Sequence, residues 1–427
     1  MELKKYKLGE ILDVTRGASL SGEFYAAKGE YVRLTCGNFD YQNNCFKENK
    51  AKDNLYYIGD FKPDFLMKEG DIITPLTEQA IGLLGSTAII PESGKYIQSQ
   101  DVAKIVCKEH LLDKDFAFYL ISSNLVKQQL SAAAQQTKIR HTSPDKIKDC
   151  IVWIPELEEQ KRIGKLLRTI DLKIELNRQL NQNLTAMAKQ LYDYWFVQFD
   201  FPNEEGKPYK SSGGEMVWNK KLKREIPKGW NISLIKDFAT TYSGSTPKST
   251  NIEYYNNGEI AWINSGELNS PIITKTTNYI TKCGLENSSA KLYPSNSILV
   301  AMYGATAGKV SLLTFEACSN QAVCGVIPTI ENMLYYVYFH ISSLYSHFIT
   351  LSTGSARDNI SQNTIKNILL PIPTRNILKL FDEKIGSIYQ MIVNNYQQID
   401  SLTMQRDELL PLLMNGQAMV NSDLAAH

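Results

Sequence analysis

The stretch from residue 155 to residue 196 places the strongest constraint on the fold of this chain. Apolar residues recur there at heptad spacing, which predicts one long helix packed against a partner helix. At about 1.5 Å per residue the helix should extend over roughly 50 Å, too long for the core of one globular domain. The expected a positions are Ile163, Ile170, Asn177, Leu184 and Leu191, and the expected d positions are Leu166, Lys173, Leu180, Met187 and Tyr194.

Length and charge set the outer limits on domain number and on binding partners. A chain of 427 residues exceeds what one hydrophobic core usually serves, so at least two domains are expected. The 46 basic and 45 acidic residues nearly cancel, so any DNA-binding face must be a local patch. No segment has the apolar length of a membrane span, and the seven cysteines form no CxxC pair. A reducing cytoplasm, buried free thiols and no metal site are therefore expected.

The chain contains a long internal repeat. IKDCIVWIP at 147–155 returns as IKNILLPIP at 365–373, a displacement of 218 residues from 147 to 365. The same displacement pairs Ile170 with Ile388 and Asn177 with Asn395. A period of this length predicts tandem duplication of a domain together with its helix. The expected a positions of the second helix are Phe381, Ile388, Asn395, Leu402 and Leu409.

The repeat predicts an α+β protein in which two similar mixed domains are separated by an antiparallel two-helix coiled coil with pseudo-twofold symmetry. Antiparallel pairing is expected because each mixed domain precedes its helix. Asn177 and Asn395 would then lie close together, in neighbouring layers, where polar residues can fix the register; solvation of both is the alternative. The expected boundaries are 1–155 for the first mixed domain, 156–197 for the first helix, 198–227 for a linker, 228–373 for the second mixed domain, 374–415 for the second helix and 416–427 for the tail.

Three segments carry a family resemblance. IPELEEQKRIGKLLRTID, LYDYWFVQFDFPNEEGKPYKSSGGEMVWN and REIPKGW resemble segments of the specificity subunit of type I DNA restriction–modification systems. The resemblance implies that each mixed domain is a target-recognition domain that reads one half of a split sequence in double-stranded DNA. It also implies that the paired helices act as a spacer and bind two methyltransferase subunits, with restriction subunits joining for cleavage. Glu159 and Gln160 fall within the segment expected at this interface, and the second helix lacks such a Glu-Gln pair.

No catalytic motif stands out in the sequence. YGATAGKV at 303–310 has three residues between its glycines where a phosphate-binding loop needs four. The tetrapeptide used by amino-methyltransferases is absent from the sequence, so the chain is not expected to be an enzyme. The resemblance places S-adenosylmethionine on the methyltransferase partner, and ATP with Mg on the restriction subunit. Two alternatives remain at this point: a coiled-coil scaffold with protein-binding heads, and a methyltransferase with a fused recognition domain.

Polar loops at equivalent places in the two halves are the best candidates for DNA contact, because Arg, Lys, Asn, Gln and Ser side chains read base edges and phosphates. QQTKIRHTSPDK at 135–146 and TGSARDNISQNT at 353–364 both precede the repeated strand. The candidates in the first half are Arg16, Ser19, Arg33, Lys138, Arg140 and His141. The candidates in the second half are Ser243, Ser245, Thr246, Lys248, Asn264, Arg357, Asn359 and Gln362.

Overall fold

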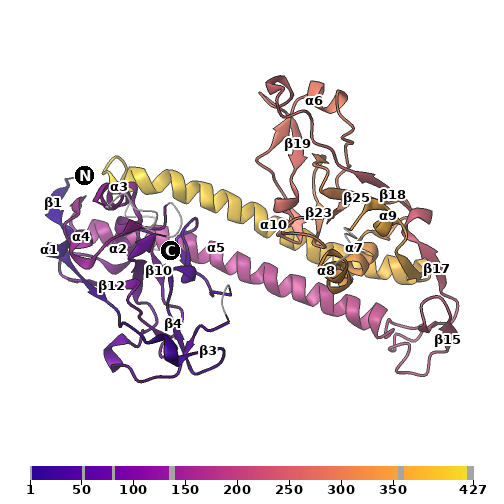
Figure 1. Ribbon diagram of the computed structural model, residues 1–427, viewed down its shortest axis with the longest axis horizontal. Helices are drawn as coiled ribbons and strands as arrows, with labels where there is room; N and C mark the ends of the chain where they lie inside the picture. The colour runs from indigo at the N-terminus through magenta and orange to yellow at the C-terminus, as the bar shows by residue number, and fades with distance from the viewer. Residues whose placement is uncertain (1, 51–52, 79–81, 134–139, 354–359, 421–427) are drawn as a thin grey trace. The chain divides into compact units, whose positions relative to one another are not determined.

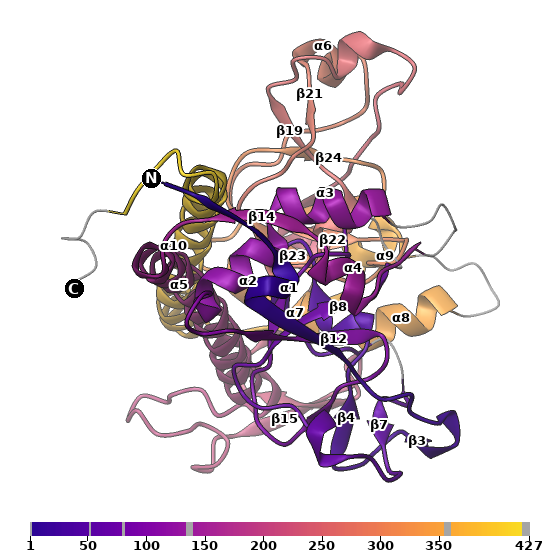
Figure 2. The ribbon, with the colours of Figure 1, turned by 90° about the vertical axis from the view of Figure 1, so that its left-hand side faces the viewer.

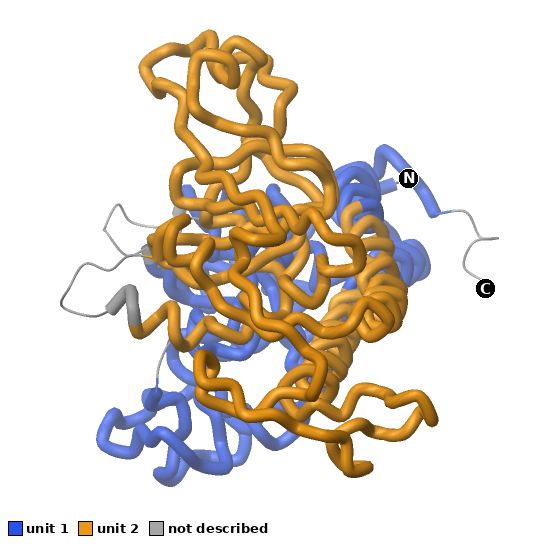
Figure 3. The backbone as a smooth tube through the Cα atoms, turned by 90° about the vertical axis from the view of Figure 1, so that its right-hand side faces the viewer, with its two compact units in different colours: residues 1–174, 401–427 blue, residues 175–400 orange. Residues whose placement is uncertain are grey.

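The computed structural model describes residues 2–50, 53–78, 82–133, 140–353 and 360–420 (Figure 1). Contacts divide the chain into two compact units, residues 1–174 with 401–427 (unit 1) and residues 175–400 (unit 2) (Figure 3). Two long helices belong to both units: α5 (Leu157–Tyr192) and α10 (Arg375–Met414). Among the described residues, no helix has both the length and the apolar character needed to cross a membrane.

Unit 1 is built on two four-stranded sheets. The first has the order β10-β8-β12-β2 and the second β11-β4-β7-β3. Their strands are β2 (Leu12–Arg16), β3 (Tyr25–Ala26), β4 (Tyr31–Arg33), β7 (Tyr56–Tyr57), β8 (Ile72–Pro75), β10 (Ala88–Ile89), β11 (Tyr96–Ile97) and β12 (Val102–Cys107). Unit 1 also contains three strand pairs: β1 (Lys4–Lys7) with β14 (Ile151–Ile154), β5 (Phe39–Asp40) with β6 (Cys45–Phe46), and β9 (Thr77–Glu78) with β13 (Arg140–His141). Its short helices are α1 (Leu8–Ile11), α2 (Lys114–Ser122), α3 (Asn124–Ala133) and α4 (Pro144–Lys148).

Unit 2 repeats this plan with a larger sheet. A five-stranded sheet has the order β18-β25-β22-β23-β20, and a three-stranded sheet has the order β21-β19-β24. Their strands are β18 (Ala239–Ser243), β19 (Ile260–Ile263), β20 (Ile272–Ile273), β21 (Tyr279–Ile280), β22 (Ser297–Ala301), β23 (Val310–Leu313), β24 (Cys318–Ser319) and β25 (Val323–Pro328). The pair β17 (Asn231–Leu234) and β26 (Leu369–Ile372) and the helices α6 (Lys282–Glu286), α7 (Leu334–Ser343), α8 (Tyr345–Thr353) and α9 (Gln362–Lys366) accompany the sheets.

The two units share topology as well as sequence, which confirms the predicted fold class and its internal repeat. In each, the first long strand pairs with a long antiparallel strand, β2 with β12 and β18 with β25. Each also contains an equivalent parallel pair, β4 with β11 and β19 with β24, and unit 2 has a second parallel pair, β20 with β23. The short helix before the last strand starts at a serine cap in both, since Ser143 Oγ accepts from the Lys146 N–H at 3.3 Å and Ser361 Oγ from the Thr364 N–H at 3.0 Å.

Helices α5 and α10 run antiparallel within each unit, as the sequence predicts. In unit 1, Arg406 Nη1 lies 2.9 Å from Asp171 Oδ1, and the Val420 N–H donates to Glu159 Oε1. In unit 2, Asn177 contacts Gln398 and Asn181 contacts Asn395 through side-chain hydrogen bonds of 3.1 Å and 2.8 Å. Rising residue numbers on α5 thus meet falling numbers on α10 in both units.

Four of the five expected d positions of α5 are wrong, since Lys173, Leu180, Met187 and Tyr194 are exposed; the fifth, Leu166, is half-buried and packs against the core of unit 1. Leu180, Met187 and Tyr194 are 42%, 52% and 38% exposed. The interface between α5 and α10, which we call the seam, instead contains the expected a positions and the residues four places after them, because Leu167, Ile174 and Ala188 are buried. The expected a positions Ile163, Ile170, Asn177, Phe381 and Ile388 are buried, and Leu184, Leu191, Asn395, Leu402 and Leu409 are half-buried.

Two polar layers interrupt the seam in unit 2. Asn395 Nδ2 donates to Asn181 Oδ1 at 2.8 Å, and Asn177 Nδ2 donates to Gln398 Oε1 at 3.1 Å. Asn177 and Asn395 therefore lie in neighbouring layers, each bonded to a different partner. Asn177 and Asn181 are 9% and 5% exposed, so the two buried amides of α5 find their hydrogen-bond partners on α10.

The segment predicted to be a linker is folded. Phe201 stacks between Tyr209 and Trp230, with ring centroids at 4.7 Å and 5.2 Å. The strands β15 (Met216–Asn219) and β16 (Arg224–Pro227) form an antiparallel hairpin beside this stack. Its Gly, Pro and Ser content is that of a linker, but the aromatic side chains supply enough apolar surface to hold it on unit 2.

Candidate nucleic-acid interface

The first candidate surface includes the exposed residues Thr246, Lys248 and Gln321, and we call it the recognition edge of unit 2. It begins at a tight turn. The turn follows β18, and its Ser245 N–H donates to Ser319 O at 2.8 Å. A Cβ on Gly244 would lie 2.1 Å from Asn320 O, so only glycine allows this approach. The turn thereby brings the loop after β18 against the residues that follow β24.

Gln321 lies at the centre of this edge, and sequence reasoning missed it. The Thr246 hydroxyl donates to Gln321 Oε1, and the Tyr303 hydroxyl donates to Gln321 O at 2.6 Å. Burial raises the pKa of Tyr303, so its hydroxyl stays protonated and can donate. Thr246, Gln321 and the candidate Lys248 are exposed, so this group of donors and acceptors faces solvent.

Three further candidates in unit 2 make hydrogen bonds between the elements next to this edge. Gln362 Nε2 donates to Thr241 O at 2.7 Å, and Ser243 Oγ donates to Gln362 Oε1 at 3.3 Å. Asn264 Oδ1 accepts from Asn320 Nδ2 at 3.2 Å. Gln362, Ser243 and Asn264 are half-buried; the first two join α9 to β18, and Asn264 joins the end of β19 to the residue after β24. Helices α8 and α9 lie on the side of unit 2 away from α10 (Figure 2).

Unit 1 has an equivalent surface, the recognition edge of unit 1, which includes the exposed residues Arg16, Ser19 and Gln100. The Ala18 N–H donates to Gln98 O at 3.0 Å, and a Cβ on Gly17 would lie 2.3 Å from that oxygen. Arg16 Nε donates to Gln100 O at 2.8 Å. Arg16, Ser19 and His141 are exposed, and the His141 Nδ1 atom lies 3.3 Å from Thr77 Oγ1. The structure therefore brings Arg16 to the edge with Gln100, a second residue that sequence reasoning missed.

Arg33 does not belong to this exposed group. It is 8% exposed, its guanidinium carbon lies 3.9 Å from the Tyr25 ring centroid, and its Nε donates to Asn54 O at 3.4 Å. The Arg33 guanidinium therefore contacts Tyr25 and Asn54 inside unit 1, which corrects the expectation that it contacts DNA. Lys138, Arg357 and Asn359 lie outside the described residues, and of Arg140 the structure describes only the backbone, which pairs with Glu78.

The comparison with known families decides the family of this chain. The profile described as "Type I restriction modification DNA specificity domain" matches residues 1–186 and 227–403. The chain belongs to this type I specificity family. Each matched segment contains one recognition edge, and the family assignment confirms the resemblance seen in the helical and linker segments.

Two curated relatives and one solved structure illustrate the type I specificity family. The type I restriction enzyme HindI specificity subunit of Haemophilus influenzae is 25% identical over 466 residues, which cover 97% of this chain and 99% of that protein. The MjaIX specificity subunit of Methanocaldococcus jannaschii is 25% identical over 325 residues, 75% of this chain and 73% of that protein. A crystal structure of a type I restriction–modification S subunit from M. genitalium has a TM-score of 0.62 at 14% identity, covering 97% of this chain and 96% of its own. That likeness shows the fold.

Glu159 and Gln160 have contacts inside this type I specificity chain. Glu159 is 4% exposed and lies 3.1 Å from Arg162 Nη1. Gln160 is 1% exposed; its Oε1 accepts from the Asp113 N–H at 3.0 Å, and its Nε2 donates to Pro155 O at 2.9 Å. Their burial corrects the expectation that these side chains are available to a partner subunit.

An exposed apolar stripe on α5 is a better candidate for the partner interface. In unit 2 it comprises Leu176, Leu180 and Met187 of α5 and Tyr194 in the π-helical turn (Asp193–Val197) that follows, at 56%, 42%, 52% and 38% exposure. A hollow of about 910 Å³ continues it, lined by residues that include Met187, Tyr194, Pro202 and Ile388. Helical spacing puts these α5 side chains on one face, beside the seam with α10. A stripe of this kind fits an apolar helix face of another protein.

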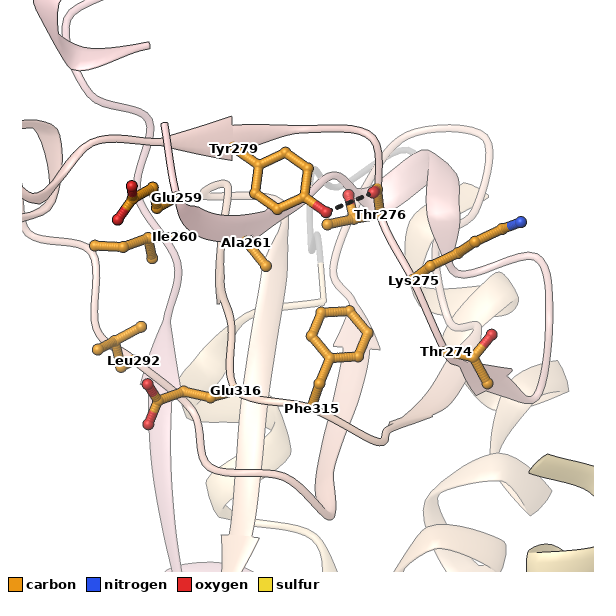
Figure 4. Close-up of a pocket in the computed structure, with 10 residues that line it drawn as sticks. All are labelled: Glu259, Ile260, Ala261, Thr274, Lys275, Thr276, Tyr279, Leu292, Phe315 and Glu316. Carbon is orange, nitrogen blue, oxygen red and sulfur yellow. Dashed lines mark hydrogen bonds between the residues drawn. The ribbon is translucent and has the colours of Figure 1, made fainter. Parts of the chain in front are cut away.

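A second hollow lies at the other end of β19, away from the recognition edge. It measures about 420 Å³. Figure 4 shows Glu259 and Glu316 on one side of it and Lys275 on the other, with the Tyr279 and Phe315 rings between them. Lys275 is already paired with Asp400 at 2.5 Å. Two exposed carboxylates make this hollow a poor place for a phosphate backbone.

The described residues contain no group of three His, Cys, Asp or Glu side chains placed to hold a metal ion. Burial raises the pKa of the Cys318 and Cys324 thiols to about 12, so both stay protonated at neutral pH. These thiols are unsuited to nucleophilic chemistry. The chemistry that this type I specificity chain displays is hydrogen bonding at two polar edges.

Proposed function

We propose that this chain is the sequence-specific DNA-binding subunit of a type I restriction–modification complex and reads a bipartite target. One recognition domain would read each half of the target. The observation that carries the proposal is the double match to a DNA specificity domain, with one exposed polar edge in each matched segment. Two recognition domains discriminate between DNA sequences more strongly than one, because each wrong base pair in either half-site typically costs about 1–3 kcal/mol of binding free energy.

The antiparallel helices would act as the spacer between the two half-sites. The Asn181–Asn395 and Asn177–Gln398 hydrogen bonds support this role, since polar pairs in a coiled-coil seam favour one register. A single register would fix one gap between half-sites. Because both recognition domains belong to one chain, binding of the first to DNA also raises the effective concentration of the second.

The proposed partners are two methyltransferase subunits and the restriction subunits. The apolar stripe on α5, from Leu176 to Tyr194, supports a helical docking surface for a methyltransferase subunit. S-adenosylmethionine would be bound by that subunit, which would methylate adenine, and ATP with Mg by the restriction subunit. The chain itself would supply recognition and no catalytic group, and would act on DNA in the cytoplasm.

Methylome sequencing tests the proposal. Host DNA would be sequenced for modified bases with and without this chain, while the methyltransferase subunit is expressed in both strains. Loss of a split, two-part adenine-methylation motif in the strain without the chain is expected. An unchanged methylome would contradict the proposal. Binding of S-adenosylmethionine by the purified chain alone would favour a methyltransferase with a fused recognition domain instead.

A further inference from the structure

A glutamine occupies the same position in both recognition edges. We propose that Gln100 and Gln321 are specificity-determining residues that contact base edges, and that each reads one A·T pair in the half-site of its own domain. The inference rests on the proposed function and specifies which side chains perform it.

The equivalence of the two positions follows from strand pairing. Gln100 precedes β12 by two residues, and Gln321 precedes β25 by two residues. One residue into each strand the pairing also agrees, since Ala103 pairs with Arg16 on β2 and Cys324 pairs with Ser243 on β18. The segments read QSQDV at 98–102 and SNQAV at 319–323, so the glutamine recurs where most of its neighbours differ.

The backbone around each glutamine is held by the same pair of hydrogen bonds. Two residues before it, the carbonyl of Gln98 or Ser319 accepts from the glycine turn, at 3.0 Å and 2.8 Å. One residue after it, the Asp101 carbonyl accepts from the Leu76 N–H at 2.8 Å, and the Ala322 carbonyl from the Met302 N–H at 2.7 Å. A backbone fixed on both sides presents its side chain in a defined direction, which reading a base edge requires.

The carbonyl of each glutamine is itself held by an edge side chain. Arg16 Nε donates to Gln100 O, and the Tyr303 hydroxyl donates to Gln321 O. The main-chain carbonyls of both glutamines are thus occupied, while both side chains are exposed. Within the described residues the Gln100 side-chain amide has no hydrogen bond, and the Gln321 amide has only the Thr246 hydroxyl on Oε1.

Carboxamide chemistry selects the base. Glutamine offers one acceptor and one donor group side by side, which match the N6 donor and N7 acceptor of adenine in the major groove. In unit 2 the Thr246 hydroxyl occupies one lone pair of Gln321 Oε1, which leaves the amide N–H₂ group and the second lone pair available to a base. Lysine or arginine at these places would favour guanine or phosphate instead.

The test uses the full chain assembled with its methyltransferase subunits and a DNA library randomised across both half-sites. Methylated products would be sequenced for the wild type, Gln100→Ala and Gln321→Ala. The wild-type chain must first give a split motif, which tests the proposed function separately. Each variant should then lose discrimination at one A·T position by roughly 5- to 150-fold, Gln100→Ala in one half-site and Gln321→Ala in the other.

Matched controls separate readout from folding. Gln179→Ala in α5 and Gln405→Ala in α10 remove exposed glutamines away from the edges and should leave the motif unchanged. Thr246→Val should partly relax the same position as Gln321→Ala, because it frees the amide to rotate. Unaltered thermal unfolding of each variant shows that the domain is intact.

Three results would overturn the inference. An unchanged motif in both glutamine variants would exclude base contact. A uniform loss of methylation across all sequences would assign these side chains to phosphate contact. Relaxation at a G·C position would reject adenine as the base that is read.

Discussion

At the residue scale, a buried ion pair ties the start of α5 to the end of α10 in unit 1. Arg406 is 8% exposed and lies 2.9 Å from Asp171, whose other oxygen accepts from the Tyr119 hydroxyl at 2.5 Å. Asp171→Ala would leave the guanidinium buried with only the exposed Asp407 as a partner. We expect a loss of about 3–5 kcal/mol in the free energy of unfolding, measured by urea denaturation. Glu158→Ala, which removes an exposed ion pair with Lys161, is the control and should have no measurable effect; an equally small effect of Asp171→Ala would show that the pair contributes no stability.

His340 gives unit 2 a pH-dependent stability. Burial, with a smaller contribution from the charge of Arg224, lowers the pKa of His340 to about 4. Its Nδ1 atom lies 3.2 Å from the Tyr192 hydroxyl. Because the pKa in the unfolded chain is about 6.5, the unfolded state binds the proton first as pH falls. This stability is fully present above pH 6.5 and is lost as pH falls towards 4, by up to roughly 3 kcal/mol.

The measurement compares wild type with His340→Gln, in which the amide can still bond to Tyr192. Unfolding free energies would be determined by denaturant titration at several values between pH 4 and pH 7.5. The variant should show a shallower decline over this range. Identical pH profiles for the two proteins would assign the acid sensitivity to other groups.

At the element scale, the polar layer between α5 and α10 is expected to set register more than stability. Asn395→Leu alone leaves the buried amide of Asn181 without its 2.8 Å donor and should cost about 1–3 kcal/mol. The double change Asn181→Leu with Asn395→Leu should recover most of that loss, because two apolar groups then meet. A double-mutant cycle from denaturant unfolding measures the coupling. Additive losses would mean that the two amides do not interact in solution.

The same helices show where sequence reasoning reached its limit. The repeat predicted their antiparallel pairing and placed Ile163, Ile170 and Ile388 in the seam. These a positions are buried whether the second set of seam residues lies three or four places after them. The repeat misplaced most of the other half of the seam, Leu166 excepted, since α5 carries apolar residues both three and four places after a. Met187 and Ala188 illustrate this: either could pack inward, and only the partner helix decides that the smaller one does.

The recognition edges were predicted in outline and corrected in detail for a similar reason. Loop polarity led to Arg16, Thr246 and Lys248, all of which are exposed. It also led to Arg33, whose partners Tyr25 and Asn54 are distant in sequence, so local composition could not reveal its burial. Gln100 and Gln321 emerge only once strand pairing aligns the two units.

At the scale of the whole molecule, the proposed spacer makes a prediction about DNA rather than about stability. Seven residues inserted in α5 after Asn181, with seven inserted in α10 before Asn395, preserve the heptad phase of the seam. Each insertion lengthens its helix by about 10.5 Å, close to the rise of about three base pairs. The methylated motif should keep both half-sites, and the gap between them should grow by about three base pairs.

Methylome sequencing of a strain that expresses the lengthened chain checks this outcome. Three base pairs also rotate one half-site by almost a third of a turn, so a lower extent of methylation is expected along with the longer gap. Insertion of two residues in each helix is the matched control, because it turns the following apolar residues by about 200°, away from the seam, and should abolish the motif altogether. A lengthened chain that still methylates the original gap would show that the helices do not set the spacing.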